Sequence, residues 1–257
     1  MGKPLAALVA AAFAVVAPAM GLPARAEVPK VVASIQPLHS LIASVMQGVG
    51  EPALVVGGSQ SEHTYALKPS DARTLQAARL VVLVDESYET FLAKPLKARA
   101  DGVEVVALAR LPGAVRLPTR EGGTWEPDHD GHDEHGHGAL DGHLWLDTGN
   151  ARLLVAAVAE RLSALDAEHA ATYRANAAAT LARLDALEAQ MKARLEPVAS
   201  RPFVVFHDAY QYLEKHYGLA AAGAITVDPD RPPSARRLAA LRDRLRTAGA
   251  ACVFREP

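Results

Sequence analysis

Histidine and carboxylate side chains are concentrated in one stretch of this chain, residues 125–147. Five of the ten histidines of the sequence lie there. Four of them, His129, His132, His135 and His137, alternate with Asp, Glu and Gly between residues 128 and 138. That segment contains no apolar side chain. Imidazole and carboxylate are good ligands for a borderline divalent ion such as zinc. The segment therefore predicts an accessory metal-binding loop, and a solvated acidic loop of little function is the alternative.

Three further histidines stand beside short apolar runs that are typical of strands. His63 follows an expected strand, His143 directly precedes a run at 144–146 that we interpret as a buried strand, and His207 directly follows the run at 203–206. Ligand sites in open α/β sheets form beyond the carboxyl ends of strands. Three neutral imidazoles and one oxygen ligand would make a tetrahedral zinc site. The remaining histidines are interpreted as structural or surface residues: His39, His169 and His216.

The elements that must position these side chains alternate along the first half of the chain. Apolar runs predict strands at 31–35, 53–56, 80–84 and 103–108. Helices are expected at 37–47, at 71–78 with Ser70 as its cap, and at 88–100 with a kink at Pro95. Strands interleaved with helices in this way predict an α/β domain with a parallel sheet.

The second half begins with an expected helix at 150–162 and continues into a long run of helix-forming residues, 164–196. That run has no Gly or Pro, and its apolar stripe lies at three- and four-residue spacing: Leu181, Leu184, Leu187 and Met191. We expect a rigid connecting helix, with a coiled coil as the alternative. Beyond it, strands at 203–206, 224–227 and 251–254 and helices at 208–217 and 234–246, the latter capped by Ser234, predict a second α/β unit.

The expected fold is therefore α/β, with two parallel-sheet lobes joined by a long rigid helix and a metal site in the cleft between them. The lobes are assigned to residues 27–163, which include the acidic His-rich loop 125–141, and to 197–257, with the helix 164–196 between them. Residues 1–26 have a Lys, an apolar run and a small-x-small site, which together predict a secretory signal peptide. Half of the residues are apolar and the net charge is −2, which fits a soluble globular protein rather than a nucleic-acid binder.

Cys252 is the only cysteine of the sequence and cannot form an internal disulfide. An odd thiol in an exported protein needs an explanation, and the chain stops soon after the strand expected at 251–254. We therefore expect the second lobe to be truncated. The alternative is that Cys252 is simply a small hydrophobic residue buried in the core.

Three segments resemble, in order and spacing, the signatures of metal-binding solute-binding proteins of bacterial ABC importers (cluster A-I), and most closely the ZnuA-type zinc-binding proteins. They are Glu62-His63-Thr64-Tyr65-Ala66-Leu67-Lys68-Pro69-Ser70-Asp71, Asp141-Gly142-His143-Leu144-Trp145-Leu146-Asp147 and Phe206-His207-Asp208-Ala209-Tyr210. The resemblance covers essentially the whole mature chain. It implies a monomeric periplasmic receptor, not an enzyme, that captures zinc between two lobes and delivers it to a membrane permease.

Carried over by position, the resemblance implies that His63, His143 and His207 are zinc ligands, with Glu62 as a possible further ligand. Manganese-binding relatives tend to have a carboxylate where this chain has His207, and a nitrogen ligand favours zinc over manganese. Family members continue past the Cys-Val-Phe-x-Glu-Pro segment and often obtain a carboxylate ligand and a partner for the cysteine there. This sequence supplies neither, so Glu62 or water would close the site.

Other functions remain as alternatives: a manganese receptor of the same family, a zinc-buffering or adhesion protein of the same fold, and a zinc-dependent hydrolase. Three histidines with an open position can also activate water. The sequence has no His-Glu-x-x-His motif and no Ser nucleophile elbow, which disfavours the hydrolase.

Overall fold

The first lobe is built on a parallel four-stranded sheet. The computed structural model describes residues 27–120, 139–226, 233–249 and 252–256. The strands are β1 (Val31–Ile35), β2 (Ala53–Val56), β3 (Leu80–Leu83) and β4 (Glu104–Ala107), in the order β2-β1-β3-β4. Every residue of β1 and β3 is buried, as expected for central strands of a parallel sheet that is covered on both faces.

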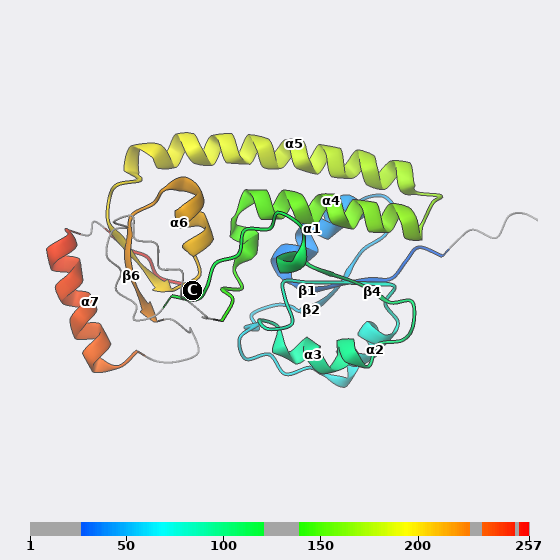
Figure 1. The fold of residues 1–257 in the computed structure, drawn as a ribbon, viewed down its shortest axis with the longest axis horizontal. Helices are drawn as coiled ribbons and strands as arrows, with labels where there is room; N and C mark the ends of the chain where they lie inside the picture. The colour runs from blue at the N-terminus through cyan, green and yellow to red at the C-terminus, as the bar shows by residue number, and fades with distance from the viewer. Residues whose placement is uncertain (1–26, 121–138, 227–232, 250–251, 257) are drawn as a thin grey trace, which may run out of the picture.

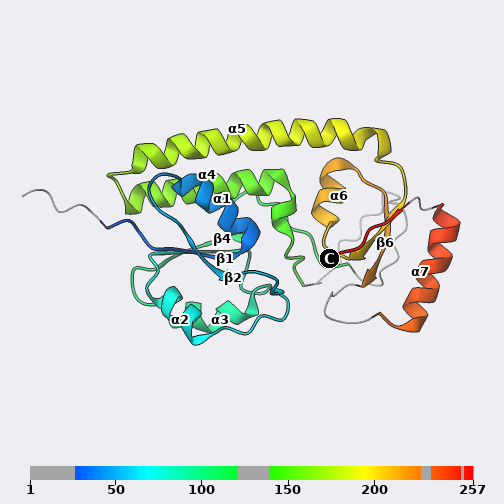
Figure 2. The same ribbon diagram turned by 180° about the vertical axis from the view of Figure 1, so that it is seen from behind.

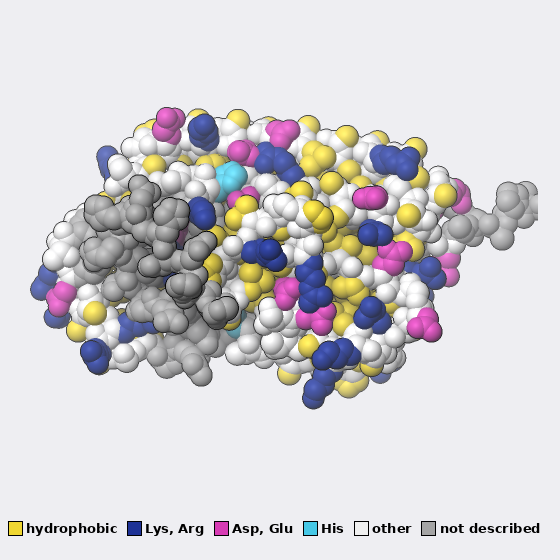
Figure 3. All heavy atoms as spheres, viewed as in Figure 1, with side chains coloured by type: hydrophobic (Ala, Val, Ile, Leu, Met, Phe, Trp, Pro, Cys, Tyr) yellow, Lys and Arg dark blue, Asp and Glu magenta, His cyan; other side chains and the backbone are white. Residues whose placement is uncertain are grey.

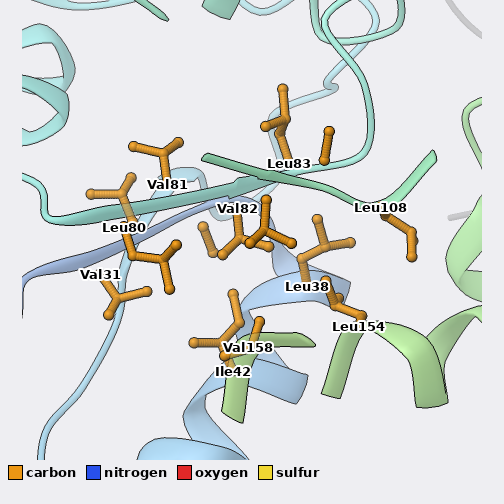
Figure 4. Close-up of a cluster of buried hydrophobic side chains, with 14 of the residues drawn as sticks. Val31, Leu38, Ile42, Leu80, Val81, Val82, Leu83, Leu108, Leu154 and Val158 are labelled. Atoms are coloured by element: carbon orange, nitrogen blue, oxygen red, sulfur yellow. The ribbon is translucent and has the colours of Figure 1, made fainter. Parts of the chain in front are cut away.

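Helices cover both faces of this sheet (Figure 1). On one face lie α1 (Gln36–Met46) and α4 (Thr148–Leu165), and on the other α2 (Pro69–Gln76) and α3 (Thr90–Lys97). Figure 4 shows Leu38 and Ile42 of α1 packed with Leu154 and Val158 of α4 beneath the strands. Helix α2 begins at Pro69, because proline is favoured in the first turn of a helix. Ser70 therefore lies inside the helix and is not its cap, contrary to expectation.

The long helix is α5 (Ala170–Leu195), which starts six residues later than expected. It is separated from α4 at residues 166–169, where the Asp166 carboxylate accepts hydrogen bonds from the Tyr173 hydroxyl and the His169 ring. Its 26 residues span about 39 Å at 1.5 Å per residue. Figures 1 and 2 show α5 running along α4 and continuing over the second lobe, so it joins the lobes as predicted.

The second lobe contains a three-stranded parallel sheet in the order β6-β5-β7. Its strands are β5 (Phe203–His207), β6 (Ala221–Thr226) and β7 (Cys252–Val253), with helices α6 (Gln211–Tyr217) and α7 (Ala235–Ala248). The Ser234 side chain caps α7 by accepting from the Arg237 N–H, as predicted. Two α/β lobes joined by a long helix confirm the predicted fold class.

Two expectations for individual strands are wrong. Residues Leu144–Leu146 form a 3-10 helix, η2, because Asp147 caps α4 at once and the Asn150 amide donates to the Leu144 carbonyl. The strand expected at 251–254 is not buried. β7 lies at the sheet edge, where Cys252 is exposed and Phe254 is 55% exposed, so Cys252 is not a buried hydrophobic residue either.

The surface and the helices add two observations. On the face drawn in Figure 3, Lys and Arg side chains are interspersed with Asp and Glu. Among the described helices, none combines the length and the apolar character needed to cross a membrane. The predicted signal peptide, residues 1–26, and the four loop histidines, His129, His132, His135 and His137, lie outside the described residues.

Candidate metal centre

The structure brings three of the predicted ligands together between the lobes. His63 lies in the loop between β2 and α2, His143 precedes η2, and His207 is the last residue of β5. One ligand nitrogen of each ring lies within 4.8 Å of the other two. His63 is exposed, His143 is buried and His207 is half-buried. These rings therefore form a half-open cluster that an ion can reach from solvent.

The spacing of two of these nitrogens fits a shared metal ion. His143 Nε2 and His207 Nε2 are 3.4 Å apart. Zinc–nitrogen bonds of about 2.0–2.1 Å in a tetrahedral arrangement place two ligand nitrogens about 3.3 Å apart. The observed pair can thus bind one zinc ion with little movement.

A buried carboxylate orients His143. Asp141 Oδ1 lies 2.7 Å from His143 Nδ1 and accepts the backbone N–H of the same residue at 3.1 Å. Because Nδ1–H donates to the carboxylate, the lone pair of Nε2 is free for a metal. Asp141 belongs to the quoted signature segment, but its spacing to His143 did not by itself indicate this role.

A second carboxylate orients His207 in the same way. Glu256 Oε1 lies 2.6 Å from His207 Nδ1. The two residues are far apart in the sequence, so no local pattern could have indicated the pair. Both carboxylate–histidine pairs leave an Nε2 atom directed at the cluster, which is the arrangement that metal-binding histidines usually have.

Glu62 is held at the edge of the cluster by an aromatic side chain. The Tyr88 hydroxyl donates to Glu62 Oε1 at 3.1 Å, and the Tyr88 ring makes edge contacts with His63 and His143 at centroid distances of 5.6 and 5.8 Å. Burial, reinforced by the Glu62 charge, raises the pKa of Tyr88, so its hydroxyl stays a donor. Among the described residues, the group of close potential ligands contains the three histidines without Glu62.

Gly142 makes the contact between Tyr88 and this segment possible. A Cβ atom at position 142 would lie 2.1 Å from Tyr88 Cδ2, inside the ring's van der Waals surface. The glycine of the Asp141-Gly142-His143 segment is therefore required by close packing and not by an unusual backbone angle.

The other described histidines have structural partners. His39 Nε2 lies 3.0 Å from the Pro52 carbonyl oxygen, and His169 Nδ1 lies 2.8 Å from Asp166. His216 lies between Asp147 and Glu188, at 3.1 and 3.4 Å. These contacts agree with their interpretation as structural residues.

Comparison with known proteins identifies the family. The family described as "Zinc-uptake complex component A periplasmic", ZnuA, matches residues 31–257. The chain is 43% identical over 259 residues to the high-affinity zinc uptake system protein ZnuA of Brucella abortus, covering 88% of this chain and 76% of the relative. It is 36% identical to that of Paracoccus denitrificans, covering 100% of this chain and 83% of the relative.

Solved structures agree on the fold. Zn(II)-bound AdcAII, a mutant variant from Streptococcus pneumoniae, has a TM-score of 0.71 at 25% identity, covering 88% of this chain and 80% of its own. A Mn-bound periplasmic metal binding protein from Candidatus Liberibacter asiaticus has a TM-score of 0.73 at 18% identity, covering 89% and 80%, and at that identity the likeness concerns the fold alone. The resemblance found in the sequence is confirmed, and the chain belongs to the ZnuA family of periplasmic zinc-uptake components.

Proposed function

We propose that this protein binds one zinc ion between its lobes through His63, His143 and His207 and delivers it to the membrane permease of an ABC importer. The observation that carries the proposal is the convergence of three imidazole nitrogens within 4.8 Å. Membership of the ZnuA family supports the predicted class, a periplasmic zinc receptor for import, and does not favour the manganese receptor. Zinc is the cargo of the protein.

The donor set explains the choice of metal. Nitrogen ligands suit zinc, whereas manganese prefers carboxylate, carbonyl and water oxygens. Asp141 and Glu256 each accept an Nδ1–H, which keeps the paired imidazoles in the tautomer that a metal needs. Glu62 or a water molecule completes the coordination, since a tetrahedral zinc site needs a fourth ligand.

We propose the remaining parts of the function on the basis of the family and the sequence. The family is one of solute-binding receptors, so the chain acts in uptake and not as a hydrolase. It is exported by the segment 1–26, works as a monomer and has no nucleic-acid partner. His129, His132, His135 and His137 form a weak accessory zinc site.

A competitive titration tests the site. The metal-stripped protein is titrated with zinc and with manganese against a chelator of known affinity, beside His207→Ala and His39→Ala variants. We expect one tight zinc site that binds manganese weakly, is lost in H207A and is retained in H39A. Tight zinc binding that survives in H207A would overturn the proposed site and would point to the four loop histidines.

A further inference from the structure

Two short arms of chain, residues 117–120 and 139–141, lie side by side next to the histidine cluster. We call them the neck. The Thr119 N–H donates to the Ala139 carbonyl at 2.8 Å, and the Asp141 N–H donates to the Leu117 carbonyl at 2.9 Å. Pro118 and Leu140 form an antiparallel bridge between these bonds. The neck is thus a small piece of sheet whose two arms are joined by backbone hydrogen bonds.

Each arm of the neck carries a side chain that leads to a zinc ligand. Asp141, on one arm, holds the His143 ring. Arg120, on the other arm, forms an ion pair through its guanidinium with both carboxylate oxygens of Asp208, the residue after His207. The neck therefore joins the first-lobe ligand to the strand end that bears the second-lobe ligand.

Arg120 also reaches the helix that follows His207. Its Nη1 donates to Glu214 Oε2 of α6 at 2.6 Å. The Asp208 and Glu214 side chains are 4% and 6% exposed, and that of Arg120 is 20% exposed. Burial raises the pKa of Glu214, and Arg120 opposes that rise. One guanidinium thus compensates two buried carboxylates, which would repel each other and lose their donors without it.

Neutral hydrogen bonds reinforce the same junction. The Gln211 amide donates to the Pro118 carbonyl at 2.8 Å. The Tyr212 hydroxyl accepts from the Leu117 N–H at 2.8 Å and donates to the Asp141 carbonyl at 3.0 Å. These bonds dock α6 on the neck. Arg120 supplies the ion pairs of this interface, and the Gln211 amide also donates to Asp141 Oδ2 at 3.3 Å.

We propose that Arg120 is a positioning residue for the metal site: through Asp208 and Glu214 it holds the end of β5, and with it His207, at the distance from His143 that one zinc ion requires. The inference rests on the proposed function, because it concerns the ligand geometry of that same site. Lysine could keep the charge but not the two-pronged contact with Asp208, since only guanidinium presents paired N–H donors.

The test uses Arg120→Gln, Arg120→Lys and a matched control, Arg152→Gln. Arg152 also pairs with two carboxylates, Asp185 and Glu188, but it joins α4 to α5, and the histidine that Glu188 also contacts is His216, outside the cluster of three. Zinc affinity is measured by chelator competition, and Co²⁺ replaces zinc so that its visible spectrum reports the coordination geometry.

A partner bonded directly to a metal ligand is worth about 10- to 100-fold in metal affinity. Arg120 acts on His207 one step further away, through Asp208, so we expect R120Q to lose about 10-fold in zinc affinity, the lower end of that range. Its Co²⁺ bands should shift and weaken, R120K should lie between R120Q and the parent, and R152Q should match the parent in both measurements. A spectral change separates positioning from a general loss of stability. If R120Q does not fold, R120K decides alone.

Parent-like affinity and spectrum in folded R120Q, or in R120K when R120Q is unfolded, would overturn the inference. The H207A variant is measured in parallel. Retained tight binding in H207A refutes the proposed site itself, whereas loss in H207A together with an unchanged Arg120 variant refutes only the positioning role.

Discussion

Replacing Asp141 with Asn should separate metal affinity from protein stability. The Asp141 side chain is 5% exposed and accepts from the backbone and the ring of His143 and, at 3.3 Å, from the Gln211 amide. Asn is nearly the same size and keeps one acceptor oxygen, so the His143 ring keeps its orientation. The negative charge that makes the imidazole a stronger ligand is lost.

The expected size of the effect follows from the geometry. Loss of an orienting partner costs about 10- to 100-fold in metal affinity, which corresponds to about 1.4–2.7 kcal/mol. The metal-free protein should change in stability by less than about 1 kcal/mol. The reason is that no ion pair of the described residues joins Asp141 to a Lys or Arg, and its partner is the His143 ring, so Asn removes a buried charge without leaving a Lys or Arg unpaired.

The assay is chelator competition for zinc together with urea unfolding of the metal-free protein. Asp166→Asn is the matched control, because Asp166 is 3% exposed and accepts from His169 Nδ1 at 2.8 Å, outside the histidine cluster. Hydrogen bonds with Tyr173 and His169 outweigh burial and lower the pKa of Asp166, so D166N should lose stability but keep its zinc affinity. Zinc affinity of D141N within twofold of the parent would refute the reasoning.

Two further predictions concern packing and pH. Gly142→Ala places a Cβ 2.1 Å from Tyr88, so the ring or the ligand segment must move by about 1 Å. We expect a stability loss of about 1–3 kcal/mol and weaker zinc binding in the same competition assay. Parent-like zinc affinity would contradict this. Burial raises the pKa of Glu89 from 4.5 to about 7, so between these pH values the folded state holds a proton that the unfolded state releases. The stability of the protein therefore falls as pH rises from about 4.5 through 7, by about 3 kcal/mol in all. Glu89→Gln should remove that fall. Urea unfolding at pH 5 and pH 8 should therefore show that the variant gains stability relative to the parent only at pH 8. An equal change in the free energy of unfolding between the two pH values in both proteins would disprove the assignment.

Much of the fold could be predicted from local patterns. A continuous buried run such as Leu80–Leu83 must pair on both sides and be covered on both faces, so it indicates a parallel sheet wherever it lies in the chain. His63 and His207 were found because ligand sites form beyond the carboxyl ends of strands in α/β lobes, whereas His143 was assigned beside a run that is not a strand. Short runs carried less information, and Leu144–Leu146 became a 3-10 helix because capping of α4 by Asp147 took precedence.

The sequence by itself therefore determined the two α/β lobes, the long connecting helix and the three candidate ligands, since these depend on hydrophobic periodicity and residue chemistry. Only the tertiary structure decided which carboxylates orient the ligands and which side chain joins the lobes beside them. Arg120 meets Asp208 across 88 positions, and Glu256 meets His207 across 49. Contacts at such separations depend on how whole elements pack, and no local pattern of charge or polarity records them.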